Sequence, residues 1–231
     1  MSWQKINVSS DLKSFEKDGK KIFNKTFIEV LKFHAPGFAP VKDESGWYHI
    51  NEYGDAIYEK RYLRAFGYYH NRAAVIDQDG ALHLNEAGTE LYSNRFLWCG
   101  NFQEELCVAR KHSGQYVYMD LDGKLIANEP FLYAGDYKDG HACVKTPKGW
   151  THIDRTGARL HNKYFLDLGV YHKGFATARD QKGWFHIDLK GKEIYAHRFM
   201  QIEPFYNGVA LVHDFEWNIK LLKENGELSS L

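Results

Sequence analysis

One short segment is repeated along this chain at an almost constant spacing. Five clear copies begin at Gly46, Gly80, Gln115, Gly149 and Gly183 and read GWYHINEYGDAIY, GALHLNEAGTELY, QYVYMDLDGKLIA, GWTHIDRTGARLH and GWFHIDLKGKEIY. Weaker copies begin at Leu12 and Ile219. The turn glycines of all copies lie 34 or 35 residues apart, at Gly19, Gly54, Gly88, Gly123, Gly157, Gly191 and Gly226. A fixed period of this size is typical of folds in which each repeat is one supersecondary unit.

A second segment follows each copy and is built on aromatic residues and a Gly-x-Ala-x-Val stretch. One example is RFMQIEPFYNGVALV from Arg198. Its relatives begin at Thr26, Arg61, Arg95, Pro130 and Lys163. The second segment therefore occurs six times and the first segment seven times, with the outermost copies degenerate. The two ends of the repeat array are expected to differ from its middle.

The local chemistry of a repeat predicts β structure. Residues 184–188 alternate with a period of two and are rich in aromatic and β-branched side chains, which favours a strand. The Asp-x-x-Gly that follows is typical of a tight hairpin turn, because Asp caps backbone N–H groups and Gly accepts a positive φ. A returning strand at 193–195 and extended pieces at 199–205 and 209–213 complete the unit. We predict about four short strands per repeat.

Composition excludes several classes of protein. The 30 Lys and Arg residues balance 30 Asp and Glu residues, so no overall field attracts nucleic acid or an anionic membrane. With 15 Phe, 15 Tyr and 6 Trp the chain is too apolar to be disordered. No secretory leader or membrane span is evident, and we expect a cytoplasmic protein. The cysteines are Cys99, Cys107 and Cys143, which lack metal-ligand spacing and are expected to be reduced, and Cys107 and Cys143 are expected to be buried.

These repeats resemble the WG-repeat (tryptophan-glycine, or KWG) proteins of bacteria. The resemblance rests on the G-W-x-x-I-D-x-x-G segment followed by F-x-x-G-x-A-x-V, and covers roughly residues 20–226. The signature dipeptide is kept at Gly46-Trp47, Gly149-Trp150 and Gly183-Trp184, and the tryptophan is lost in the other copies. The family resemblance implies a β-propeller-like binding module, and it brings no catalytic residues.

Burial explains why such units must be arrayed. A small sheet with two partly apolar faces cannot cover them alone, so neighbouring units must pack face to face. We predict a single all-β domain over 1–231, a β-propeller-like array of about six four-stranded units of 34–35 residues. The expected units are 46–79, 80–114, 115–148, 149–182, 183–217 and a sixth in which 218–231 joins 20–45, with 1–19 as an extension or cap. The alternative is an open twisted β-solenoid with capped ends.

Histidine recurs at one repeat position in four of the five clear copies, at His49, His83, His152 and His186, and the copy from Gln115 has Tyr118 there. A polar residue that recurs at unit spacing normally makes the same packing or hydrogen-bonding contact in every unit. The alternative is that the four imidazoles converge on one metal ion. We favour the packing role and expect no metal and no cofactor. The tryptophans and an aligned column of aromatic residues are likewise expected in the core, rather than as a platform for sugars. That column comprises Tyr69, Phe102, Tyr137, Tyr171 and Phe205.

Two repeat positions vary in a way that no structural requirement explains, and these are the candidate binding residues. The first comprises Glu29, Arg64, Trp98, Tyr133, Asp167 and Gln201. The second lies five residues after the turn position and comprises Lys42, Asp77, Arg110, Lys145, Arg179 and His213. Because Lys and Arg dominate the second column, it could form a site for phosphate or carboxylate.

No nucleophile motif, phosphate loop or zinc motif is present, so we identify no catalytic residues and do not expect an enzyme. The hypothesis we favour is a non-enzymatic recognition module that binds a protein or peptide partner through one face of the repeats. The alternative is a protein that binds a small molecule or sugar, or an enzyme, with an anion site at the axial mouth. Neither nucleic acid nor a membrane is an expected partner.

Overall fold

The computed structural model describes residues 3–126 and 130–230, and they form an all-β protein. Apart from one 3-10 turn at Trp3–Lys5, the regular structure of these residues consists of short strands. Within the described part of the chain, no helix has the length and apolar character needed to cross a membrane. The chain divides into an N-terminal unit, residues 1–114 and 118–125, and a C-terminal unit, residues 115–117 and 126–231.

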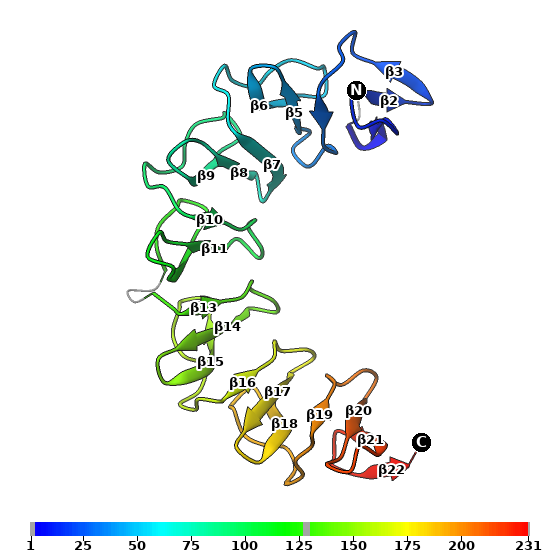
Figure 1. Cartoon of the computed structure of the whole chain (residues 1–231), viewed down its shortest axis with the longest axis vertical. Coiled ribbons are helices and arrows are strands. Elements are labelled where there is room, and N and C mark those ends of the chain that lie inside the picture. Colours follow the sequence, from blue (N-terminus) through cyan, green and yellow to red (C-terminus); the bar gives the residue numbers. More distant parts are fainter. Residues whose placement is uncertain (1–2, 127–129, 231) are drawn as a thin grey trace. The chain divides into compact units, whose positions relative to one another are not determined.

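The N-terminal unit is built from three-stranded antiparallel sheets that follow one another along the chain (Figure 1). The first contains β1 (Asn7–Val8), β2 (Phe15–Lys17) and β3 (Lys20–Ile22), and the second contains β4 (Glu29–Val30), β5 (Ala39–Asp43) and β6 (Gly46–Ile50). The third contains β7 (Arg64–Tyr69), β8 (Arg72–Ile76) and β9 (Ala81–Leu84). The fourth, with β10 (Trp98–Cys99), β11 (Cys107–Arg110) and β12 (Tyr116–Met119), lies where the sequence passes between the units.

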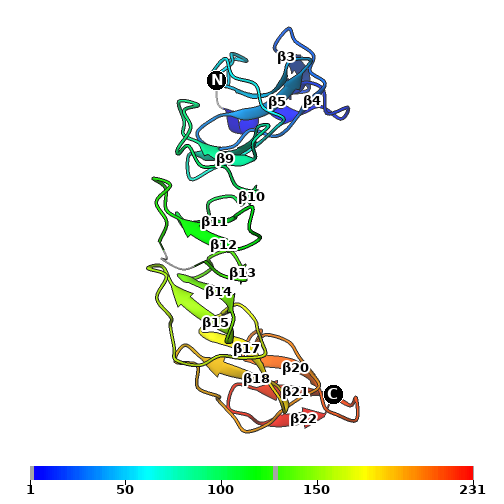
Figure 2. The same ribbon diagram turned by 60° about the vertical axis from the view of Figure 1, so that its left-hand side comes forward.

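The C-terminal unit continues the same pattern, and Figures 1 and 2 show its sheets in chain order. One sheet contains β13 (Tyr133–Ala134), β14 (His141–Thr146) and β15 (Gly149–Asp154), and the next contains β16 (Asp167–Leu168), β17 (Phe175–Asp180) and β18 (Gly183–Asp188). The last has four strands, β19 (Gln201–Ile202), β20 (Val209–His213), β21 (Ile219–Lys223) and β22 (Leu228–Ser230).

The sheets do not coincide with the predicted sequence units. In each full sheet the Gly-x-Ala-x-Val segment is the central strand, and the Gly-Trp segment of the following sequence unit is the third strand, as β5 and β6 show. One sheet therefore joins the second half of one unit to the first half of the next. Because each full sheet starts with a second segment and ends with the first segment of the next unit, one first segment is left over at the start of the array. This copy, from Leu12, forms β2 and β3, which share a sheet with β1.

The predicted fourth strand is reduced to one β-bridge in each of the five clear copies. The bridges are Ile50 with Ala56, Leu84 with Glu90, Met119 with Leu125, Ile153 with Arg159 and Ile187 with Glu193. The Asp188 carboxylate accepts backbone N–H groups from Lys190 and Lys192, which folds the chain back tightly. The chain then leaves toward the next sheet, so no longer pairing forms. In the last sheet this strand is longer, because β22 pairs with β21 over three residue pairs beside β20 and β19.

The glycine of the Gly-Trp segment is required by a close backbone approach. Trp47 and Tyr62 exchange backbone hydrogen bonds of 2.9 Å, which ties the third strand of one sheet to the segment entering the next. Gly46 has φ of +130°, and a Cβ atom there would lie 2.9 Å from the Tyr62 carbonyl oxygen. At Gly80 the corresponding oxygen, that of Phe96, would be only 2.5 Å away. With φ positive, a side chain at Gly46 or Gly80 would clash with this oxygen unless the backbone shifted. The third copy has Gln115 at this position, without a positive φ, and keeps the same exchange between Tyr116 and Phe131.

The recurring histidines are buried and join successive sheets. In His83, Nδ1 lies 2.7 Å from the Tyr92 hydroxyl and Nε2 lies 2.8 Å from the carbonyl oxygen of Gly100, a residue of the next sheet segment. The other three repeat this bridge, from His49 to Phe66, from His152 to Gly169 and from His186 to Glu203. The packing role predicted for this column is confirmed, because both nitrogens of each ring have a protein partner.

An aromatic column packs against these imidazoles in the core. Its members are Phe33, Tyr68, Phe102, Tyr137, Tyr171 and Phe205, all buried. The prediction was wrong in one repeat, where Tyr68 rather than Tyr69 is the core residue. Tyr68 lies four residues after Arg64, the spacing that separates Tyr171 from Asp167, so the regular alignment of the repeats places Tyr68 in this column. The tryptophans divide similarly: Trp47 is buried, whereas Trp98 and Trp217 are exposed.

Candidate functional site

The first variable column begins the first strand of each of the six repeated sheets. Its residues Glu29, Arg64, Trp98, Tyr133, Asp167 and Gln201 open β4, β7, β10, β13, β16 and β19. These strands are short, and their opening residues are half-buried or exposed. The sequence therefore places one variable side chain at the same edge of every sheet.

The second variable column lies directly across from the first. The antiparallel partners are Glu29 with Lys42, Trp98 with Arg110, Tyr133 with Lys145, Asp167 with Arg179 and Gln201 with His213. Cross-strand partners share a face of the sheet, so the two columns form one row. One assignment was wrong: Arg64 pairs with Ile76, not Asp77. The turn residue with positive φ in that repeat is Asn71, one position earlier than the sequence comparison assumed.

In the N-terminal unit part of this row is occupied by internal contacts. The Arg64 guanidinium lies 4.1 Å above the ring of Trp47 and 3.4 Å from a carboxylate oxygen of Glu29. These contacts bury Trp47 almost completely. Arg64 and Glu29 thus help to hold one sheet against the next, while Trp98 remains exposed.

In the C-terminal unit the same positions are more open. Tyr133 is exposed and its ring lies 5.3 Å from that of Trp150. The Lys145 ammonium lies 5.6 Å from the Trp150 ring, and the Arg179 guanidinium lies 5.9 Å from the Trp184 ring. Both cations are exposed, and neither makes an ion pair with any residue in the described part of the chain. This row can therefore offer aromatic faces and unneutralised cations together.

A further column of exposed aliphatic side chains was missed in the sequence. It precedes the first variable column by one residue and comprises Ile28, Leu63, Leu97, Leu132, Leu166 and Met200. Their exposed fractions range from 45% to 63%. The backbone N–H of each donates to the carbonyl oxygen of the residue across the sheet, as Leu166 does to Arg179 at 2.9 Å. In the sequence this column is visible as a repeat position that always holds Ile, Leu or Met. A repeat position of this kind is equally typical of a buried core residue, so the pattern does not show that these side chains are exposed.

Shallow grooves form where this aliphatic column meets the row. In the N-terminal unit a groove of about 520 Å³ is lined by Lys42, Trp47, Leu63 and Asp77, among others. In the C-terminal unit a groove of about 510 Å³ is lined by the residues 103 positions later, Lys145, Trp150, Leu166 and Asp180. Ile28 lines a third, also about 510 Å³. The same chemical surface therefore recurs with the repeat.

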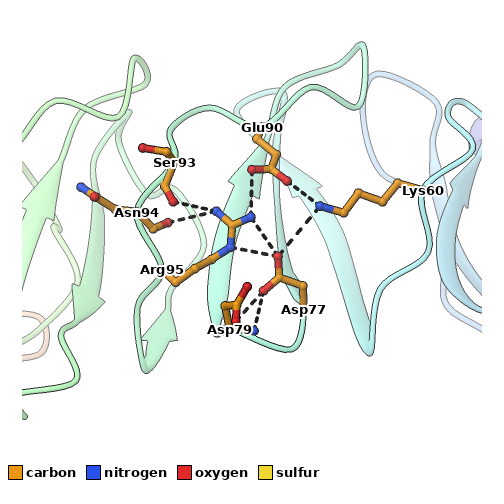
Figure 3. Close-up of polar contacts among 8 residues, drawn as sticks. Lys60, Asp77, Asp79, Glu90, Ser93, Asn94 and Arg95 are labelled. Atoms are coloured by element: carbon orange, nitrogen blue, oxygen red, sulfur yellow. Dashed lines mark hydrogen bonds and ion pairs between the residues drawn. The ribbon is translucent and has the colours of Figure 1, made fainter.

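An arginine clamp holds the segment beside each groove in several repeats. Figure 3 shows the clamp at Arg95, which contacts Asp77 and Glu90 at 2.9 Å each and donates to the carbonyl oxygens of Ser93 and Asn94. Lys60 reaches the other oxygen of Glu90 at 2.6 Å. The hydrogen bond from Lys60 outweighs burial and holds the pKa of Glu90 below its usual value. Asp77 thus serves this clamp, which accounts for an acidic residue there.

The three cysteines, Cys99, Cys107 and Cys143, are buried and free, and burial was predicted for Cys107 and Cys143. Burial raises the pKa of Cys99 and of Cys143 to about 12, which makes both thiols poor nucleophiles. Across residues 3–126 and 130–230, no group of three His, Cys, Asp or Glu side chains is arranged to hold a metal ion.

Comparison with known proteins yields structural likeness only. No protein-family profile matches the chain, and no curated protein sequence matches it. A solved structure of a eukaryotic initiation factor is similar with a TM-score of 0.56 and 10% identity, covering 97% of this chain and 72% of that one. BamB from Moraxella catarrhalis gives a TM-score of 0.45 at 12% identity, covering 94% of this chain and 75% of that one. The likeness to the initiation factor shows a β-propeller-like fold.

Proposed function

We propose that this protein is a non-enzymatic recognition module of the WG-repeat type that binds a protein partner through the row and its aliphatic column. The observation that carries the proposal is the aliphatic side chain exposed at one position of all six repeated sheets. A single exposed leucine is ordinary on a protein surface. Three recur on successive sheets of the N-terminal unit and three on successive sheets of the C-terminal unit, and exposed apolar side chains gathered in this way are typical of interaction sites.

The charges beside this surface favour an acidic partner segment. Lys145 and Arg179 flank the groove of the C-terminal unit, and they lack carboxylate partners among the described residues. A bound peptide with Asp or Glu next to apolar side chains would neutralise these cations and cover Leu166. Recurrence of the groove would let one partner segment contact several repeats, which increases avidity without requiring a deep pocket.

The proposal is tested by selecting random 12-residue peptides on the full chain and measuring the affinity of an enriched peptide by fluorescence anisotropy. We expect the enriched sequences to combine Asp or Glu with Leu or Phe. The substitution Leu166→Asp or Arg179→Glu should weaken binding about 10-fold or more, equivalent to about 1.4 kcal/mol.

The matched control is Leu189→Asp. Leu189 is a similarly exposed aliphatic residue of the same unit, but it lies after β18, in the turn, and outside the row. Its substitution should change the affinity less than twofold. The proposal fails if no peptide is enriched, or if Leu166→Asp and Leu189→Asp affect binding equally.

A further inference from the structure

The arginine clamp recurs at Arg198, and comparison of the two copies shows which side chains a complete clamp contains. Arg198 contacts Asp180 at 2.9 Å and Glu193 at 2.6 Å, which matches Arg95 with Asp77 and Glu90. The Arg198 guanidinium also lies 3.8 Å from the ring of Phe185. A clamp therefore consists of an arginine, two carboxylates and an apolar side chain beneath the guanidinium.

The repeat that contains β14 and β15 has lost every part of this clamp. The β-bridges fix the correspondence, because Ile153 pairs with Arg159 as Ile187 pairs with Glu193, and Trp150 pairs with Phe165 as Trp184 pairs with Phe199. By this register Tyr164 replaces the arginine, Thr146 and Arg159 replace the two carboxylates, and Thr151 replaces Phe185. The charge of the three ionic positions changes from one negative to one positive.

These replacements line a cavity of about 670 Å³ in the C-terminal unit, the size of a small-molecule site. Its walls include Thr146, Thr151, Arg159 and Tyr164, together with Phe131 and Ile153. Thr151 is fully buried, and its Oγ1 has no hydrogen-bond partner in the described structure. A buried hydroxyl without a partner is costly, so it is either a defect or one half of a contact with a ligand.

The rim of the cavity is positively charged. Arg159 and Lys148 both line it, and within the described residues neither makes an ion pair. The Arg159 guanidinium lies 5.4 Å from the Tyr164 ring, so charge and aromatic surface are adjacent there. Arg95 and Arg198 are each paired with two carboxylates. In the repeat of β14 and β15, by contrast, Arg159 and Lys148 are left without a carboxylate partner among the described residues.

We propose that this cavity binds a small aromatic carboxylate. The ring would fill the space that Phe185 occupies in the neighbouring repeat, and the carboxylate would pair with Arg159 and Lys148. The hydroxyl of Thr151 would gain a polar partner. The cavity adjoins the groove of the C-terminal unit and shares Thr146, Lys148 and Tyr164 with it. Its buried end at Thr151 lies on the other side of the sheet from Trp150, because the two residues alternate along β15.

The test uses the full chain and four probes, namely benzoate, phenylacetate, cinnamate and indole-3-acetate, titrated by isothermal calorimetry and by amide NMR shifts. We expect at least one probe to bind saturably and to shift the amides of Thr151 and Arg159. The neutral analogue of that probe, with an alcohol in place of the carboxylate, should bind at least 10-fold more weakly.

Two variants locate the site. Thr151→Phe restores the side chain of the neighbouring repeat and should abolish binding by filling the cavity. Arg159→Glu changes only an exposed rim residue and should weaken binding at least 10-fold even if Thr151→Phe does not fold. Arg155→Glu is the matched control, an exposed arginine in the same hairpin that does not line the cavity, and should leave the affinity within twofold.

The proposal is overturned if none of the four probes binds saturably. It is also overturned if binding survives both Thr151→Phe and Arg159→Glu, or if Arg155→Glu weakens it as much as Arg159→Glu does.

Discussion

Each recurring histidine lies between a side chain of its own repeat and a backbone carbonyl of the next. Burial is the main cause that lowers the pKa of His49, His83, His152 and His186 to about 4. The neutral ring is the form that fits both contacts, since one nitrogen donates and the other accepts. The same geometry that joins the sheets therefore makes them sensitive to acid.

We predict that the free energy of unfolding falls as the pH drops from 6.5 toward 4. The unfolded chain binds protons on these histidines near pH 6.5, whereas the folded chain binds them only near pH 4, so acid favours unfolding. Each histidine contributes about 3 kcal/mol that is present above pH 6.5 and lost by pH 4. Urea unfolding at pH 7.0, 5.5 and 4.5 measures the slope, and a free energy independent of pH over this range would contradict the assignment.

Residue roles could be predicted from the sequence where recurrence and chemistry agreed. A histidine repeated at one position pointed to a packing role, because a single metal site would not explain why Tyr118 can replace it. Recurrence could not identify the exposed column represented by Leu166, since an aliphatic residue at a fixed repeat position fits a core equally well. Recurrence does separate Tyr68 from Tyr69, because Tyr68 keeps the four-residue spacing from the first variable column that Tyr171 also keeps.

At the scale of the elements, the Gly-Trp segment couples one sheet to the next through paired backbone hydrogen bonds. Trp47 with Tyr62, Trp150 with Phe165 and Trp184 with Phe199 make the same exchange. The sequence predicted the turns and most of the strands, because periodicity and turn residues are local signals, but the returning strand predicted at 193–195 is only a bridge at Glu193. It did not predict which strands would share a sheet. The period of a repeat is the same wherever the unit is taken to begin, so it does not show where one sheet ends and the next begins.

We predict that Gly80→Ala destabilises the protein much more than Gly140→Ala. At Gly80 the new Cβ would meet the Phe96 carbonyl oxygen at 2.5 Å with φ at +138°. At Gly140 φ is +77° and no heavy atom lies within 4 Å of the Cβ position. The first substitution should cost about 3 kcal/mol and the second about 1 kcal/mol. Chemical denaturation of both variants measures the difference, and equal losses would show that the close approach does not constrain this strand.

At the scale of the whole molecule, each sheet depends on its neighbours in the repeat array. The prediction of an all-β, propeller-like array followed from the period and from the inability of a small sheet to cover both its faces. The number of strands per sheet and the pairing of β22 did not follow, because they depend on where the chain leaves each turn. In an array of this kind, damage to one link should spread to the two sheets it joins and diminish with distance.

Hydrogen exchange of the full chain carrying His83→Ala tests this dependence most directly. The substitution removes the contact between His83 in β9 and the Gly100 carbonyl of the next sheet segment. We predict faster exchange in both β7–β9 and β10–β12, with the strands of the last sheet, β19–β22, unchanged. Faster exchange confined to β7–β9 would contradict the claim that the sheets stabilise one another.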